Sequence, residues 1–225
     1  MLGLGRGERL LIVSNPGGDV REISMAIFDA ASDVGAAPVL VFQREKGQFD
    51  FAEEEVVKAM HAEPDAVLSI STDRFGKDRV GLLKGYRGKR KYNDYFEMLY
   101  EERRSRAFWS PGVTKEMFRR TVPIDYRTLR SDCRDVVRLM NSSAQVRVTA
   151  PGGTDITIGV RGRKAKADDG DFRRAGAAGN LPSGEVYVSP ELGTAEGVIA
   201  FDGSIALNED QLVISNPIVA QVSGG

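Results

Sequence analysis

The stretch Leu10-Leu11-Ile12-Val13-Ser14-Asn15-Pro16-Gly17-Gly18-Asp19 decides the fold of the first half of this chain. Four consecutive apolar residues are typical of a parallel strand that is buried on both faces. A Pro/Gly turn follows, and Asp19 is predicted to cap a helix whose apolar residues recur at helical spacing. Gly35 is placed to end that helix.

The strand-helix pattern then repeats. Residues 38–42 and 66–70 are apolar runs that predict a second and a third strand, and residues 51–61 predict a short acidic helix between them. Short links between alternating strands and helices imply right-handed crossovers and a parallel sheet. Further along, Thr114 is predicted to cap one helix, and Asp125 begins another.

The pattern changes near Asn141-Ser142-Ser143. Residues 146–149 and 156–160 alternate apolar and polar side chains around a Pro/Gly turn, which predicts a β-hairpin. Asp202-Gly203 is a second hairpin signal. Further short strands are expected at residues 186–188, 198–201, 205–207, 212–214 and 218–222. The predicted fold is an α/β domain with a parallel sheet and crossover helices over residues 1–143, followed by a β-rich, mostly antiparallel domain over residues 144–225.

Composition sets broad limits on function. The 225 residues are 41% hydrophobic and 28% charged, with a net charge of -1, so nothing calls for nucleic acid or an anionic membrane as a partner. The single cysteine excludes an internal disulfide and fits a reducing compartment. No apolar run approaches membrane-spanning length, and residues 1–7 lack the apolar core of a signal peptide. These features predict a cytoplasmic protein.

Two segments invite a ligand-binding interpretation and have a simpler alternative. The loop Asn15-Pro16-Gly17-Gly18 follows a strand, but it matches neither the dinucleotide fingerprint nor the P-loop, so a tight turn is favoured over a phosphate site. Residues 84–106 interleave basic and aromatic side chains, as single-stranded nucleic-acid binders do. Acidic residues occur among them, and aromatic residues at helical spacing favour an amphipathic helix.

Other reactive side chains have structural explanations. Cys133 falls on the apolar stripe of the helix predicted to begin at Asp125, which favours a buried small hydrophobe over a nucleophile. His61 is the only histidine, and a surface position is expected for it. Asp168, Asp169 and Asp171 suggest calcium, but the EF-hand spacing is missing, so a solvated turn is favoured.

Glu185 is the candidate metal ligand. It ends the stretch Gly179-Asn180-Leu181-Pro182-Ser183-Gly184-Glu185, directly before the β-branched run that starts at Val186. A carboxylate held between a rigid turn and a strand is well mounted for a metal ion. The alternative, an isolated exposed glutamate at a strand edge, stays open on the residues alone.

A series of short motifs carries a family resemblance. In order, they are Ser110-Pro111-Gly112-Val113-Thr114, Gly153-Thr154-Asp155-Ile156, Asp169-Gly170, Asn180-Leu181-Pro182-Ser183-Gly184-Glu185-Val186, and Gly197 ahead of Phe201-Asp202-Gly203-Ser204-Ile205. In this order and spacing the chain resembles the thermophilic aminopeptidase family, the group that includes aminopeptidases T and S and proteins labelled leucyl aminopeptidases. The resemblance runs from about Leu10 to the last residue.

This resemblance implies a metallopeptidase, a hydrolase active in proteolysis that uses two divalent metal ions, zinc or cobalt, to remove N-terminal residues from a peptide substrate. It implies a homodimer, and it places the first metal-ligand glutamate of the family on Glu185. The other ligands of the family lie downstream of this block and have no counterpart up to Gly225. A carboxylate-only site built from Glu185, Asp155 and residues 168–171 is the remaining way to hold a hard cation, and the alternative is that this chain binds no metal.

Two alternatives from other classes stay open. By resemblance, the same fold occurs in an iron-dependent ring-cleaving dioxygenase that acts on dihydroxypyridine, and the downstream ligand set would separate that activity from peptide hydrolysis. The other alternative is a non-catalytic scaffold or binding relative that keeps the fold without the metal site. The sequence leaves open whether this chain is itself active.

Overall fold

The computed structural model describes residues 1–207 and 211–225. The chain forms two compact units. Unit 1 comprises Met1–Tyr126 and Gly170–Ser183, and unit 2 comprises Arg127–Asp169 and Gly184–Gly225. The chain therefore contributes to each unit twice. The sequence-based boundary at residue 143 stays a prediction; that position lies just after the last helix.

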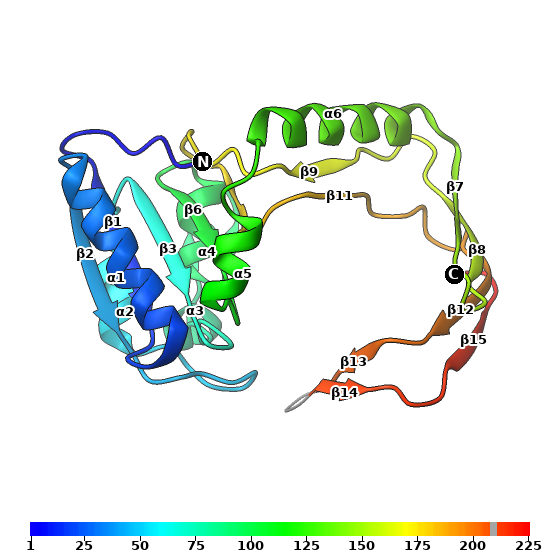
Figure 1. Cartoon of the computed structure of the whole chain (residues 1–225), viewed down its shortest axis with the longest axis horizontal. Helices are drawn as coiled ribbons and strands as arrows, with labels where there is room; N and C mark the ends of the chain where they lie inside the picture. Colours follow the sequence, from blue (N-terminus) through cyan, green and yellow to red (C-terminus); the bar gives the residue numbers. More distant parts are fainter. Residues whose placement is uncertain (208–210) are drawn as a thin grey trace. The chain divides into compact units, whose positions relative to one another are not determined.

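Unit 1 is built on a five-stranded parallel sheet. Its strands are β1 (Arg9–Ser14), β2 (Ala37–Phe42), β3 (Ala66–Ile70), β6 (Arg106–Trp109) and β10 (Ala178–Asn180), in the order β10-β6-β3-β1-β2. Its helices are α1 (Gly18–Asp33), α2 (Glu54–Met60), α3 (Arg79–Leu83), α4 (Tyr95–Glu101) and α5 (Lys115–Thr121). Figure 1 shows α1 and α5 in front of the sheet, with α2 and α4 behind it.

Alternation along β1 creates two hydrophobic cores, one on each face of this sheet. Leu10 and Ile12 pack with apolar residues of α1 and with Phe108. Leu11 and Val13 point the other way and pack with apolar residues of α2 and α4. All five residues of β3 are buried, which explains the uninterrupted apolar run in the sequence.

The basic and aromatic run divides between two elements. A short hairpin, β4 (Tyr86–Arg87) with β5 (Lys91–Tyr92), precedes helix α4. The helix expected over this run is therefore shorter than its pattern suggests. Arg90 bonds to Glu97 and Glu101 of α4 at 2.7 and 3.1 Å. Pairing of this kind supports a solvated ionic surface over a nucleic-acid platform.

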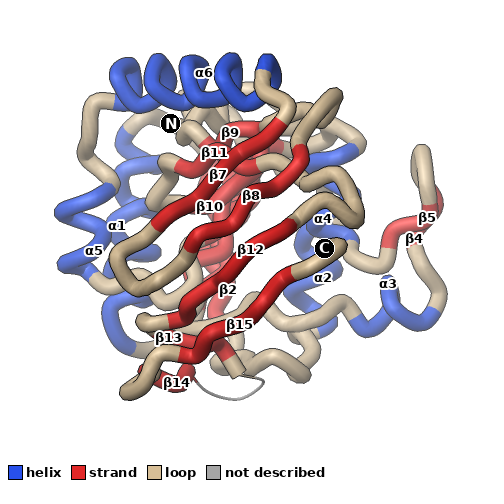
Figure 2. The backbone as a smooth tube through the Cα atoms, turned by 90° about the vertical axis from the view of Figure 1, so that its right-hand side faces the viewer, coloured by secondary structure: helices blue, strands red, loops and turns tan. Residues whose placement is uncertain are grey.

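Unit 2 is mostly antiparallel. Helix α6 (Tyr126–Ser142) leads into a sheet of β7 (Gln145–Thr149), β8 (Asp155–Gly159), β12 (Glu196–Phe201) and β15 (Ile218–Val222), in the order β15-β12-β8-β7. Two smaller pairs are β9 (Lys166–Asp168) with β11 (Glu185–Tyr187), and β13 (Ser204–Ala206) with β14 (Gln211–Val213). Figure 2 shows the four main strands side by side. The predicted fold class, α/β followed by β-rich, is confirmed.

Local signals were correct at some positions and wrong at others. Thr114 caps α5, since its hydroxyl accepts a hydrogen bond from the Met117 N–H at 3.1 Å. Asp19 does not cap α1: Gly17 holds the N-cap position, and Asp19 lies in the first turn. Asp202-Gly203 joins β12 to β13 without pairing them, because β12 pairs with β8 and β15 instead.

Within residues 1–207 and 211–225, no helix has the length and apolar character needed to cross a bilayer.

Candidate functional site

The carboxyl ends of the parallel strands of unit 1 meet at one edge, where open α/β sheets bind ligands. The order of the strands reverses between β1 and β3, and Asn15 fills that crevice. Its amide donates to the Gln43 carbonyl at 3.0 Å and accepts from the Thr72 N–H at 2.8 Å. Gln43 in turn donates to the Phe75 carbonyl and accepts from the Glu53 N–H. Buried amides therefore occupy this point and link the loops around it.

The start of α1 is also unsuited to phosphate. Asp19 accepts a hydrogen bond from the Lys115 N–H at 2.8 Å, and the Lys115 ammonium donates to Glu22 at 2.7 Å. Two carboxylates in the first turns would repel an anion there. The loop after β1 is thus a tight turn, as the sequence favoured.

One strand further along, an open cavity of about 380 Å³ lies at the ends of β3 and β6. Its aromatic side chains are Phe75, Phe96, Tyr100 and Trp109. Phe75 stacks on Phe96 with 5.5 Å between ring centroids, and Phe96 and Tyr100 each lie about 6 Å from Trp109. The Trp109 indole N–H donates to Asn180 of β10 at 2.9 Å, which fixes the orientation of that ring.

Polar groups of α4 also line this cavity. Asp94 caps the helix by accepting from the Glu97 N–H at 3.0 Å, and burial raises the pKa of its carboxyl group. Burial likewise raises the pKa of Tyr100 to about 12, so its hydroxyl keeps its proton at neutral pH. The cavity therefore combines aromatic faces with a hydrogen-bond acceptor and a donor. Sequence reasoning missed it, although Phe96 and Tyr100 at i,i+4 ahead of the single tryptophan were a usable signal.

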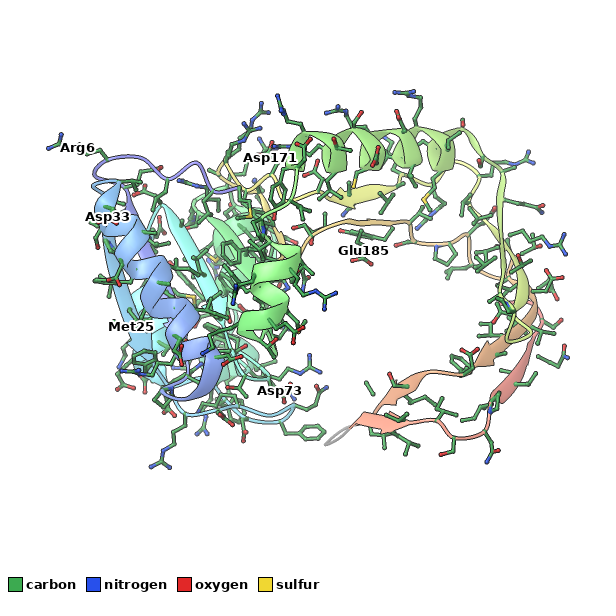
Figure 3. All side chains as sticks on the ribbon, viewed as in Figure 1. Arg6, Met25, Asp33, Asp73, Asp171 and Glu185 are labelled. Carbon is green, nitrogen blue, oxygen red and sulfur yellow. The ribbon has the colours of Figure 1, made fainter. Side chains whose placement is uncertain are left out.

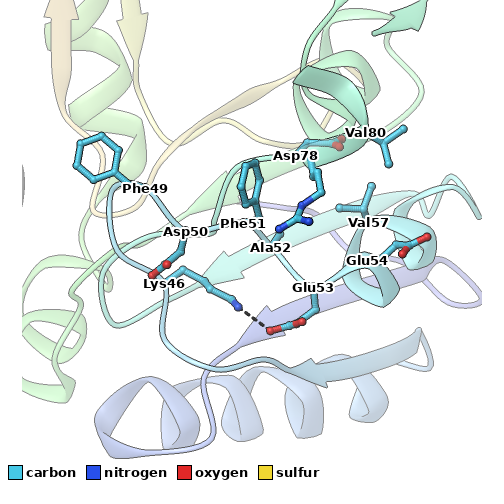
Figure 4. A pocket seen from close by; sticks show the side chains of 11 residues that line it. Lys46, Phe49, Asp50, Phe51, Ala52, Glu53, Glu54, Val57, Asp78 and Val80 are labelled. Atoms are coloured by element: carbon cyan, nitrogen blue, oxygen red, sulfur yellow. Dashed lines mark hydrogen bonds and ion pairs between the residues drawn. The ribbon is translucent and has the colours of Figure 1, made fainter. Parts of the chain in front are cut away.

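A larger cavity of about 600 Å³ lies beside α2 and α3 (Figure 4). Its charged groups are engaged with one another and with the backbone. The Lys46 ammonium bonds to Glu53 at 2.6 Å, and the Arg79 guanidinium lies 4.5 Å from the centroid of the Phe51 ring. Buried Asp78 accepts bonds from the Gly81 and Tyr95 N–H groups. These groups stabilise the local structure, so this cavity is a weaker candidate for a functional site than the aromatic cavity.

Glu185, the predicted metal ligand, is the first residue of β11 and lies opposite Asp168 of β9. Its side chain is exposed, and Figure 3 shows it extending from β11 away from α6. The motif that carries it is split, because Ser183 ends a segment of unit 1 and Gly184 begins a segment of unit 2. The position of Glu185 therefore depends on the β9–β11 pair.

The other candidate carboxylates are committed elsewhere. Asp155 accepts two bonds from the Arg147 guanidinium at 2.8 and 2.7 Å, which lowers the pKa of Asp155. Asp171 is bonded to Arg173 in the same way. In the part of the chain that the structure describes, no three His, Cys, Asp or Glu residues gather closely enough to hold a metal ion. The carboxylate-only site is therefore not formed by these residues.

Cys133 and His61 lie as expected. Cys133 is the buried residue of α6, and burial raises the pKa of its thiol. His61 is exposed and packs against Tyr95 with 4.1 Å between ring centroids.

Comparison with known proteins identifies the family. A family model described as NicX: 2,5-dihydroxypyridine 5,6-dioxygenase matches residues 113–225. The chain belongs to this family. The NicX match begins at Val113 and covers every strand of unit 2 as well as Glu185.

A solved structure shares the fold. It is described as 2,5-dihydroxypyridine dioxygenase from Pseudomonas putida KT2440, and it matches with a TM-score of 0.68 at 16% sequence identity. The match covers 99% of this chain and 62% of that chain, so the present chain spans less than two thirds of its structural relative. No curated protein matches.

Membership in the NicX family corrects the aminopeptidase resemblance. The assignment to the thermophilic aminopeptidases was wrong. The labels metallopeptidase, hydrolase and proteolysis that followed from it were therefore also wrong. The peptide substrate implied by that resemblance is therefore also wrong.

The quoted motifs misled because they describe backbone geometry. Gly197 has a φ of +133°, and a Cβ there would overlap the Asp155 carbonyl oxygen. A motif that preserves such a close approach of two strands identifies a scaffold, and the chemistry depends on other side chains.

Proposed function

We propose that this chain belongs to a protein that uses dioxygen to open the ring of a hydroxylated pyridine. The observation that carries the proposal is the NicX family match, which spans residues 113–225. The shared fold of a 2,5-dihydroxypyridine dioxygenase supports it. Because the chain spans 62% of that relative, the proposal concerns the whole protein to which these residues belong.

A divalent metal ion is the cofactor that we propose. Ring opening by dioxygen needs an ion that can change its oxidation state, as iron does and zinc does not. This requirement favours one iron ion over the two zinc or cobalt ions expected from the sequence. We propose Glu185 as a ligand, since its exposed carboxylate forms no ion pair within residues 1–207 and 211–225. Those residues do not by themselves form a complete donor set for the ion.

The test is direct. The whole protein to which these residues belong, loaded with ferrous iron in air, is given 2,5-dihydroxypyridine while oxygen uptake and ring absorbance are recorded together. Turnover should consume oxygen and substrate in equal amounts. An amino-acid p-nitroanilide should not be cleaved. Oxygen uptake without loss of the ring would exclude ring opening.

Glu185→Gln removes a metal-binding charge at almost constant volume. It is expected to lower bound iron, measured by elemental analysis, at least tenfold, which corresponds to about 1.4 kcal/mol of binding free energy. Glu191→Gln is the matched control, because Glu191 is an exposed glutamate of the same unit. Equal iron content in the two variants would show that Glu185 is not a metal ligand.

A non-catalytic scaffold is the second candidate. It is favoured by the lack of a metal-ligand cluster in residues 1–207 and 211–225. If this candidate is correct, the 225-residue chain binds no iron and shows no turnover. Bound iron or turnover above background would reject it.

A further inference from the structure

The open aromatic cavity of unit 1 is separate from the proposed metal ligand Glu185 in sequence and belongs to unit 1 alone. All the residues that line it lie between Ser69 and Pro111, outside the segment that the NicX family model matches. Its volume of about 380 Å³ is in the range of small-molecule sites, roughly 300 to 1,000 Å³. It also lies at the carboxyl ends of two adjacent parallel strands, since Ser69 of β3 is in register with Trp109 of β6.

The aromatic side chains leave ring surface open to a ligand. Phe96 and Trp109 are each half-buried, in contrast to Phe108 in the core beneath the sheet. The Phe96 and Trp109 rings meet edge to face at 76°, so their faces point in different directions. A planar ring can stack on one of them and meet the edge of the other, an arrangement that aromatic groups favour.

The polar groups select the charge of the ligand. Glu97 is neutralised by Arg90 at 2.7 Å, and Asp73 pairs with Arg74 at 3.4 Å. Asp94 has no ion-pair partner within the described residues 1–207 and 211–225, and it keeps acceptor capacity beyond its capping bond. A carboxylate that lines the cavity repels an anionic ring and accepts a hydrogen bond from a hydroxylated one.

We propose that this cavity is a binding site for a small, uncharged, hydroxylated heteroaromatic ring, which stacks on Phe96 and Trp109 and donates a hydrogen bond to Asp94. The choice of a hydroxypyridine as that ring rests on the proposed function. The site itself stands on the cavity and its side chains.

The chain supplies its own reporter, because Trp109 is the only tryptophan. The experiment titrates the full chain, in the presence of a metal chelator, with 3-hydroxypyridine and separately with nicotinate, a pyridine of the same ring size that carries a carboxylate. Tryptophan emission is recorded and corrected for absorption with free N-acetyltryptophanamide. We expect a saturable change with 3-hydroxypyridine and about tenfold weaker binding of nicotinate, a difference near 1.4 kcal/mol.

Two variants test the residues. Phe96→Leu removes one stacking ring and is expected to weaken 3-hydroxypyridine binding about tenfold. Asp94→Asn keeps a residue that caps helices well, removes the charge, and is expected to reduce the preference for 3-hydroxypyridine over nicotinate. Asp33→Asn, at the far end of α1, is the matched control and should bind like the parent chain. Circular dichroism establishes that each variant is folded.

The outcomes separate this proposal from the proposed function. A chain whose emission does not respond to 3-hydroxypyridine, or that binds nicotinate equally well, overturns the site as stated. If Phe96→Leu does not fold, Asp94→Asn still tests the site. An unchanged preference for 3-hydroxypyridine over nicotinate in that variant would also overturn it. Saturable binding by this chain, without ring opening by the iron-loaded whole protein, would retain the site and reject the proposed function.

Discussion

Arg106 is a buried guanidinium at the start of β6, with 7% of its side chain exposed. Glu8 accepts two hydrogen bonds from it at 2.9 and 2.7 Å, and Arg106 also donates to the Leu2 carbonyl at 3.2 Å. Such a bidentate pair ties the N-terminal segment to the sheet. The hydrogen bond from Arg106 is the main reason that the pKa of Glu8 is lowered.

This pair makes stability depend on pH in a definite direction. Glu8→Gln leaves a buried cation without its anion and is expected to lower the free energy of unfolding by about 2 kcal/mol at neutral pH, less than for a fully buried pair. Because the folded pKa is depressed, the contribution is complete above the unfolded value of 4.5 and is lost as pH falls through the folded pKa. Urea unfolding of the parent and the variant should therefore converge once the pH falls below the depressed pKa of Glu8 in the folded state.

The matched control for this prediction is Glu54→Gln. Glu54 forms an exposed i,i+4 pair with Lys58, so its loss should leave the unfolding midpoint almost unchanged. A Glu8 effect that stayed constant down to acidic pH would show that packing, and not the charge, explains it.

Among the elements, those with strong local patterns were predictable and those set by pairing were not. The apolar runs of β1 and β3 and the cap at Thr114 were correct from the sequence alone. Strand β10 contains Ala178-Gly179-Asn180, which has little strand propensity, and it forms because β6 offers an open edge. Strand β6 begins with a buried arginine, so its apolar signal is short.

The candidate site was predictable only in part for the same reason. Glu185 could be proposed from its turn and strand, because both signals are local. The cavity around Trp109 gathers side chains from β3, β6 and α4, and the sequence alone does not reveal their proximity.

At the level of elements, a substitution at Gly197 tests whether β8 and β12 need a glycine to approach each other this closely. Its φ of +133° is unfavourable for other residues, and a Cβ would lie 2.9 Å from the Ile156 Cα. Gly197→Ala should cost about 2–5 kcal/mol from backbone strain and overpacking. Hydrogen exchange should then accelerate in residues 155–159 and 196–201 and stay unchanged in β1 and β3.

Gly203→Ala is the matched control, because a Cβ at Gly203 meets nothing within 4 Å. It should keep the exchange protection of β8 and β12. Equal protection in both alanine variants would mean that the backbone at Gly197 adapts without cost.

For the whole molecule, unit 1 is discontinuous in sequence, because the segment 170–183 completes it. Phe172 and Leu181 of this segment are buried with Phe108 in the core on the α1 face. The Leu181 N–H donates to the Trp109 carbonyl at 3.0 Å, and its carbonyl accepts from the Ser110 hydroxyl at 2.5 Å. An α/β unit cut at residue 126 would lack an edge strand and two buried side chains.

Residues 1–126 expressed alone are therefore expected to fold poorly, since each missing side chain contributes about 1.5–3 kcal/mol. A second version joins residue 126 to residue 170 by a short Gly/Ser linker, which is long enough because a Cβ at Gly170 would meet the Tyr126 ring. Trp109 emission should be red-shifted, as in an exposed indole, in the first version and close to that of the full chain in the second. If residues 1–126 alone matched the full chain in emission and in urea midpoint, the segment 170–183 would be dispensable, and unit 1 would be a continuous domain that merely docks it.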